Sequence, residues 1–397
     1  MKTEIKALTG LRFIASYSIV LAHFWSIVTF GDAPRFNATY LSFAFFGMSL
    51  FFTLSGFVIY YNYADAFHRR SFGEALRSFA VARFARIYPL FIFFFGVAAA
   101  MLRPNLYNEG MILDLPLLQS WVPPSGDTMP IQRFGYMAHS WSISTEFFFY
   151  AAFPILCFTI LREPRSLKAA WLGFILLIIG AFAVLYAFYT VDLGYWLAPT
   201  APHGRYWLVY FSPYTRILEF IIGAASARLV LAAGRCSVTA TEHRAMTAIA
   251  IPCLAGLAWL FYWTRFYDPE NYQTFLRFAR VGLLHAPMFA FLMFYVSRYQ
   301  STLQRILSWP PLVAGGEISY SIYLLHIFFG ASFLEVTVPW SAGSLVFWVA
   351  RMALLSIWII CLATGLYLTI EVPCRRWIRA ALGSRPKVPA LVAVPAE

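Results

Sequence analysis

The chain has 397 residues, of which 60% are hydrophobic and only 12% are charged. Water-soluble domains carry charge on about a quarter of their residues, so this composition excludes an ordinary soluble globule. Apolar runs of about 20 residues recur along the sequence, which is the length an α-helix needs to cross a hydrocarbon core of about 30 Å. Because unpaired backbone groups find no partner in lipid, we expect an all-α, polytopic integral membrane protein and no open sheet.

About ten of these apolar runs are expected to span the membrane. The first run has no small-residue cleavage site behind it, so we expect it to be retained and not removed as a signal peptide. The expected spans, in chain order, are 9–30, 41–62, 87–103, 140–160, 169–191, 214–233, 245–264, 278–297, 312–335 and 344–371.

The formal net charge of +12 is explained by membrane orientation. An even number of spans puts both termini on one side, and most of the 30 Lys and Arg residues fall on that side. By the positive-inside rule, both termini are expected to be cytoplasmic. This orientation accounts for the positive charge, so we expect membrane lipids as partners and no nucleic acid. We expect one membrane domain over 1–380 and a short, disordered cytoplasmic tail over 381–397.

The segments between spans carry two further expectations. Segments 104–139 and 192–213 are expected to be long outer loops, and loops of that length are usually functional. The five cysteines lie in or beside apolar runs without a Cys-x-x-Cys pair. This pattern signals neither a metal site nor a disulfide framework.

Ionisable side chains inside the expected spans indicate function, because an unpaired charge in lipid costs at least about 2.5 kcal/mol. At about 1.5 Å of rise per residue, His23, Glu146 and His326 fall at similar depth in the outer half of the membrane. We therefore expect them to converge in one buried site. Glu317 is expected to lie lower in the same span as His326.

Three arginines are placed to bind an anion near the cytoplasmic side. Arg12 lies three helical turns before His23, on nearly the same helix face and about 16 Å away. Arg83 and Arg86 have the i, i+3 spacing that presents two guanidinium groups together, a suitable fork for phosphates. The alternatives are that Arg12 only snorkels to the membrane surface and that the pair contacts anionic lipid.

Short motifs containing these residues follow one another along nearly the whole chain. They are Leu8–Arg12 followed by His23, then Phe51–Phe57, Arg83–Pro89, Ser140–Phe147, Ser319–His326 and a closing Glu371–Pro373. The ordered set resembles the membrane acyltransferase-3 family, the integral membrane O-acyltransferases of glycans.

The resemblance implies transfer of an acyl group, most often acetyl from acetyl-CoA, in the cytoplasmic (inner) membrane. The acceptor would be a hydroxyl of an envelope or extracellular glycan or glycolipid, such as lipopolysaccharide O-antigen or exopolysaccharide. The family's functional positions match Arg12, His23, Arg83, Arg86 and Glu146. We expect the arginines to hold the phosphates of the acyl-CoA, and His23, oriented by Glu146, to act as general base or to carry the acyl group.

An acceptor sugar would meet aromatic and hydrogen-bonding groups near the outer side. The candidate acceptor-binding residues are His139, Trp141, Tyr320 and His326. An interfacial aromatic belt is the alternative for the tryptophans, and packing or support of the site is the alternative for Tyr320 and His326.

Two further expectations concern the class of protein. A secondary transporter or glycolipid flippase, with buried His and Glu as proton relays, is the alternative function, although no inverted repeat is visible. Family members often carry an esterase-like domain after the membrane domain. The sequence here ends soon after the last expected span, so transfer is expected to finish within the membrane domain or on a separate partner.

Overall fold

The computed structural model describes residues 4–28, 39–101, 109–123, 135–199, 203–234, 236–265, 274–337 and 345–382. All regular elements within these ranges are helices, and none of the described residues lies in a strand. The all-α prediction is therefore confirmed. Most of the expected tail over 381–397, and parts of the expected loop over 104–139, lie outside the described residues.

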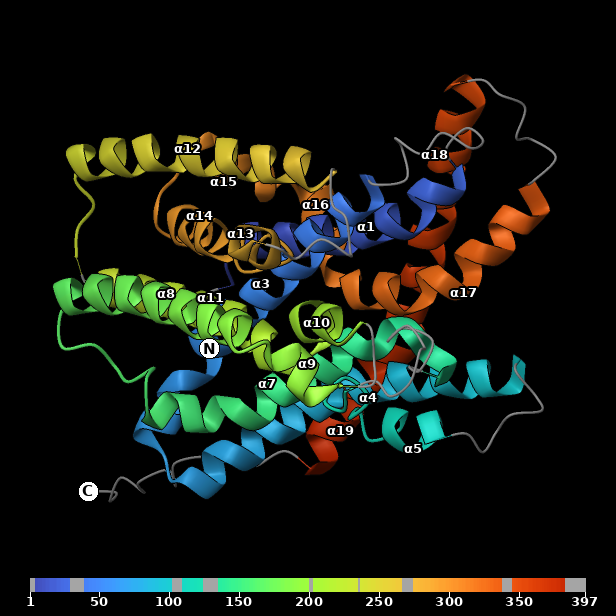
Figure 1. Ribbon diagram of the computed structural model, residues 1–397, viewed down its shortest axis with the longest axis horizontal. Coiled ribbons are helices and arrows are strands. Elements are labelled where there is room, and N and C mark those ends of the chain that lie inside the picture. The colour runs from blue at the N-terminus through green and yellow to red at the C-terminus, as the bar shows by residue number, and fades with distance from the viewer. Residues whose placement is uncertain are drawn as a thin grey trace, which may run out of the picture.

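Most of the long helices lie along the long axis of the molecule, whereas α18 runs across it (Figure 1). The first half of the chain contains α1 (Lys6–Val28), α3 (Thr39–Arg69), α4 (Phe72–Met101), α5 (Glu109–Asp114), η1 (Gly135–Ser140), α7 (Trp141–Phe158), α8 (Leu167–Thr190), α9 (Leu193–Leu197), α10 (Gly204–Tyr206) and η2 (Trp207–Phe211). The second half contains α11 (Pro213–Ala233), α12 (Ala240–Thr264), α13 (Phe275–Ala279), α14 (Ala286–Arg298), α15 (Thr302–Leu307), α16 (Pro310–Glu317), α17 (Ser319–Thr337), α18 (Leu345–Leu366), η4 (Tyr367–Glu371) and α19 (Val372–Leu382).

Among the described residues, seven helices are long and apolar enough to cross a bilayer, and the bent pair α16–α17 would make eight. Two of the expected spans are not among them. Helix α14 has only 13 residues. Helix α11 has 21 residues but includes the charged Arg216, Glu219 and Arg228. The structure thus supports a multi-pass membrane protein, while the count of ten spans and the cytoplasmic termini stay predictions.

Helices α3 and α4 extend further toward the expected cytoplasmic side than the apolar runs indicate. Helix α3 continues to Arg69, and α4 begins at Phe72. The basic stretch with Arg77, Arg83 and Arg86 and the expected third span therefore form one helix. Pro89 lies inside this helix without ending it. As a result, Arg83 and Arg86 are fixed to the same rigid element as the membrane-spanning part of α4.

The expected ninth span is broken. Helices α16 and α17 meet at Ile318 and are bent by 68° relative to each other. Glu317 is the last residue of α16 and its side chain is exposed, so it lies at the break between the two helices. The expectation that it lies lower in the same span as His326 stays a prediction.

Helices α3 and α11 pack with their backbones in direct contact at two glycines. A Cβ atom on Gly56 would lie 1.9 Å from the carbonyl oxygen of Phe220, and one on Gly223 would lie 1.8 Å from that of Thr53. Small residues permit this close approach between membrane helices. The contact fixes the middle of α3, which forms one wall of a cavity lined by Arg12, Arg83 and Glu146.

The 192–213 segment, expected as an outer loop, contains short helices α9, α10 and η2. Its ends are joined by an ion pair in which Arg205 binds Asp192 with two nitrogens, one of them at 2.7 Å. Hydrogen bonds from Arg205 lower the pKa of Asp192 from its usual value. Within its described residues, the segment is therefore a set of short helices with an ion pair between Asp192 and Arg205.

Candidate active site

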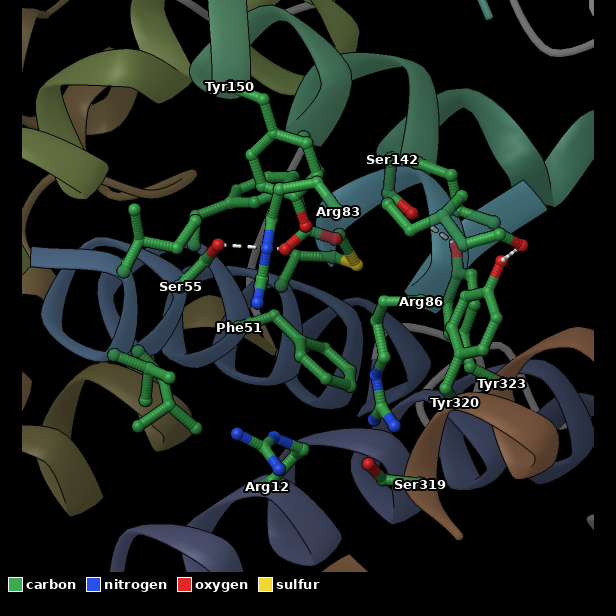
Figure 2. A pocket seen from close by; sticks show the side chains of 18 residues that line it. Arg12, Phe51, Ser55, Arg83, Arg86, Ser142, Tyr150, Ser319, Tyr320 and Tyr323 are labelled. Atoms are coloured by element: carbon green, nitrogen blue, oxygen red, sulfur yellow. Dashed lines mark hydrogen bonds between the residues drawn. The ribbon is translucent and has the colours of Figure 1, made fainter. Parts of the chain in front are cut away.

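A partly open cavity of about 120 Å³ lies between α1, α3, α4, α7 and α17. Figure 2 shows that its walls carry polar side chains from helices far apart in the sequence. Five of the residues singled out in the sequence line it, namely Arg12, Arg83, Arg86, Glu146 and Tyr320. The resemblance and the packing of the helices thus select the same place.

Three guanidinium groups face this cavity (Figure 2). Arg12 reaches it from α1 and has no hydrogen bond or ion pair with any described residue. Arg83 reaches it from α4, donates to the hydroxyl of Tyr63 at 2.9 Å, and lies over the rings of Tyr63 and Tyr150. An anion entering here would meet at least one guanidinium group that is not engaged in a hydrogen bond or ion pair with a described residue.

Arg86, the third cation, is held by Glu371. Its Nη1 hydrogen-bonds to Oε1 of Glu371, whose side chain is 1% exposed. The same carboxylate accepts from the hydroxyl of Ser321 at 3.0 Å and lies 3.8 Å from Arg375. Sequence reasoning noted Glu371 only as part of a closing motif. Its position in η4, a π-helical segment, is a local geometry that often marks functional sites.

Glu146 supplies the carboxylate of the cavity wall. It projects from α7 and accepts a hydrogen bond from the hydroxyl of Ser55 at 2.8 Å. Tyr150, one turn further along α7, lines the same cavity. The three guanidinium groups that line the cavity therefore outnumber its lining carboxylate Glu146, even when Glu371 beside Arg86 is counted, and this favours an anionic ligand.

His23 and His326 meet beside this cavity. Nε2 of His326 lies 3.1 Å from Nδ1 of His23, and their ring centroids are 4.9 Å apart. Nδ1 of His23 also lies 2.9 Å from the carbonyl oxygen of Ile19. The ring of His139 packs against His326 at 5.7 Å, and its buried Nε2 has no hydrogen-bond partner among the described residues.

Tyr323 and Ser142 join the histidines to the cavity, because both also line it. The Tyr323 hydroxyl lies 2.5 Å from the carbonyl oxygen of His139 and 2.5 Å from the Ser142 hydroxyl. Among the described residues, Glu146 accepts a hydrogen bond from Ser55, and His23 is hydrogen-bonded to Ile19 and His326. The expected pairing of Glu146 with His23 thus stays a prediction.

The remaining candidate residues have distinct surroundings. Trp141 is 5% exposed and packs against Tyr210 and Phe211, so its ring belongs to the core. Tyr320 donates to the carbonyl oxygen of Ile87 at 2.8 Å, and its ring lies 5.8 Å from the guanidinium of Arg86. Tyr320 therefore helps to shape the arginine end of the cavity.

Within the described ranges, no group of three or more His, Cys, Asp or Glu residues has a geometry that could hold a metal ion. The contacts between His23, His139 and His326 that the structure shows are a hydrogen bond and ring packing.

Comparisons with known proteins agree on a family. A family model described as an acyltransferase domain, of the acyltransferase-3 type, matches residues 5–370. The acyltransferase MdmB of Streptomyces mycarofaciens is 30% identical over 58% of this chain and 58% of its own length. A putative O-acetyltransferase of Staphylococcus aureus (strain COL) is 24% identical over 81% of this chain and 50% of its own length.

The O-acetyltransferase OatA of Staphylococcus aureus (strain NCTC 8325 / PS 47) is 24% identical over 84% of this chain and 53% of its own length. The matches thus span between 50% and 58% of the length of these relatives. No solved structure matches the chain significantly. Because the family model covers nearly the whole sequence, the chain belongs to the acyltransferase-3 family.

Proposed function

We propose that the protein is a membrane O-acyltransferase. It transfers an acyl group, acetyl in the first instance, from cytoplasmic acyl-CoA to a hydroxyl of an envelope or extracellular glycan or glycolipid. The family and the names of the similar proteins support acyl transfer to oxygen. The single observation that carries the proposal is the cavity with three inward-facing guanidinium groups, which adjoins the His23–His326 pair.

The arginines fit the phosphates of an acyl-CoA. Guanidinium groups form paired, charge-assisted hydrogen bonds with phosphate oxygens, and these bonds strengthen where water is scarce. Arg12 is the cation most available for binding, because it has no hydrogen bond or ion pair with a described residue. Arg83 and Arg86 add charge while Tyr63 and Glu371 fix their directions.

His23 is placed to activate the acceptor. In the direct route, it removes the proton from the acceptor hydroxyl as the oxygen attacks the thioester carbonyl carbon. The carbon–sulfur bond then breaks, and the departing thiolate takes up the proton from the imidazolium. In the covalent route, a ring nitrogen of His23 attacks the thioester carbonyl carbon, the carbon–sulfur bond breaks and coenzyme A leaves as the thiolate. The acceptor hydroxyl then attacks the acyl carbon, the carbon–nitrogen bond breaks, and the hydroxyl proton passes to the released imidazole and from there to the thiolate.

Glu146 acts in the same reaction through its charge. A carboxylate on the cavity wall offsets part of the positive charge of the guanidinium groups and stabilises an imidazolium that forms nearby. It also takes part in positioning the donor, because its partner Ser55 faces the same space. His139 and Tyr320 belong to the surroundings of the acceptor and the donor, respectively.

The test uses inside-out membrane vesicles containing the protein, with acetyl-CoA labelled in the acetyl group. We expect label in the glycolipid or polysaccharide fraction and release of an equal amount of free coenzyme A. Vesicles that carry an Arg12→Ala, Arg83→Ala double variant are the control and should incorporate little label at low donor concentration. Movement of unmodified glycolipid across the membrane, without label incorporation, would establish a flippase and contradict the proposal.

A further inference from the structure

Two short contacts of His23 and one of His326 determine which ring nitrogen of His23 carries the proton. We propose that His326 is a positioning residue that holds His23 as the Nδ1–H tautomer, so that Nε2 carries the reactive lone pair. The inference rests on the proposed function for its catalytic meaning. Its structural content stands on the hydrogen bonds of the half-buried imidazole of His23 and the buried imidazole of His326, and it can be tested without any transfer assay.

The first step concerns His326, whose side chain is 0% exposed. Its Nδ1 lies 2.5 Å from the carbonyl oxygen of Tyr323. A carbonyl oxygen can only accept, so Nδ1 of His326 must carry the hydrogen. In a neutral ring the other nitrogen, Nε2, is then an acceptor.

The second step concerns His23. Its Nδ1 lies 2.9 Å from the carbonyl oxygen of Ile19, which again can only accept. The same Nδ1 lies 3.1 Å from Nε2 of His326, the nitrogen that the first step leaves as an acceptor. One hydrogen on Nδ1 of His23 therefore serves both acceptors in a three-centre bond, a common arrangement near helix backbones.

The opposite assignment fails on the same contacts. If Nδ1 of His23 were unprotonated, its lone pair would face the carbonyl oxygen of Ile19 at 2.9 Å. His326 would then have to donate from Nε2, and as a neutral ring it would turn a second lone pair toward the carbonyl oxygen of Tyr323 at 2.5 Å. Burying two unpaired acceptors costs about 1–3 kcal/mol each, so the Nδ1–H form prevails.

The group that orients His23 is therefore the neutral imidazole of His326 and not a carboxylate. Nε2 of His23 is left with its lone pair free to take a proton or an acyl group. Once His23 is protonated, Nδ1–H still donates to Nε2 of His326, so the charge is stabilised without moving a heavy atom. His326 thereby acts through His23, and no direct contact with substrate is needed.

The experiment is nitrogen NMR of the full-length protein in lipid nanodiscs with ¹⁵N-labelled histidine. The chain has seven histidines, and the His23 signals are identified by their loss in His23→Ala. We expect a protonated Nδ1 and an unprotonated Nε2 in the wild type. In His326→Leu, which has similar volume but no acceptor, we expect a mixture of tautomers and a kcat lower by about 10–100-fold.

Two further variants separate positioning from packing. His326→Gln returns an oxygen acceptor near the position of Nε2, so we expect it to restore the tautomer and part of kcat. Leu325→Val removes one methylene from the neighbouring buried position on α17 and should leave the His23 spectrum unchanged.

The outcomes are decisive in each direction. A wild-type His23 with its proton on Nε2 would overturn the inference, as would a His326→Leu variant with unchanged tautomer and kcat. If His326→Leu fails to fold, the wild-type spectrum and the Gln variant still decide. A correct tautomer in a protein without acyl transfer would contradict only the proposed function.

Discussion

At the scale of single residues, the three cavity arginines differ in what holds them. Arg12 has no described hydrogen-bond or ion-pair partner, whereas Arg86 is bonded to the buried carboxylate of Glu371. Removing an unpaired cation leaves nothing unsatisfied, but removing one member of a buried pair leaves an uncompensated charge. The two substitutions should therefore separate ligand binding from stability.

Arg12→Ala should raise the KM for acyl-CoA with little effect on the melting temperature. Loss of a charge-assisted hydrogen bond to phosphate costs about 1.5–3 kcal/mol, which corresponds to roughly 10–100-fold in KM. Because such contacts are made equally in the ground and transition states, kcat should change less. Donor titration of detergent-purified protein measures both, and an unchanged KM would remove Arg12 from the donor site.

Arg86→Ala should destabilise the fold by about 3–5 kcal/mol, because Glu371 is left buried without its main cation. Adding Glu371→Gln removes the stranded charge, so the double variant should melt at a higher temperature than Arg86→Ala alone. Thermal unfolding in detergent compares the two. A double variant that is less stable than Arg86→Ala would show that Glu371 stabilises the fold through Ser321 and Arg375 instead.

Part of this site can be predicted from the sequence. Helical rise fixes the depth of a residue, and it correctly indicated that His23 and His326 can meet. Depth does not fix the rotation of one helix relative to another. For that reason the contact between Arg86 and Glu371, 285 residues apart in the chain, could not be foreseen.

At the scale of elements, the closest contact between α3 and α11 depends on the absence of side chains. Gly223→Ala would place a Cβ 1.8 Å from the carbonyl oxygen of Thr53. The helices would have to separate, and such overpacking typically costs about 1–3 kcal/mol or more. Because α3 carries Phe51 and Ser55 on the cavity wall, activity should fall together with stability.

Gly180→Ala is the matched control for this prediction. A Cβ at Gly180 on α8 meets nothing within 4 Å. The substitution should be neutral or slightly stabilising, because alanine favours a helix by about 1 kcal/mol over glycine. Equal losses in melting temperature for the two variants would show that the α3–α11 contact tolerates a side chain.

Apolar runs located the helices well but not their breaks or their full lengths. The break at Ile318 has no proline at that position, and the extension of α4 back to Phe72 passes through polar residues. Hydropathy measures whether a stretch suits lipid, and it is insensitive to a bend within an apolar run. The short α14 shows the same limit, because the turn before it is buried and mostly apolar although it contains Arg280 and His285.

At the scale of the whole molecule, the proposed reaction requires the part of the cavity lined by Arg12, Arg83 and Arg86 to open toward the cytoplasm. The connection between α3 and α4 should then be cytoplasmic, and the connection between α4 and α7 should lie outside. In a variant without native cysteines, Ser71→Cys should react with an impermeant thiol reagent only from the cytoplasmic side, and Val122→Cys only from the outside. The reverse pattern would contradict the topology and the cytoplasmic donor.

In the proposed reaction, His23 performs the transfer chemistry. Acyl transfer by His23→Ala in inside-out vesicles tests this role directly. Labelled acetyl-CoA is supplied at saturation, and the amount of inserted protein and its melting temperature are matched to the wild type. Loss of a general base lowers the rate by about 10²–10⁴-fold, so we expect transfer close to the background of empty vesicles. Transfer by His23→Ala at near the wild-type rate would contradict the account.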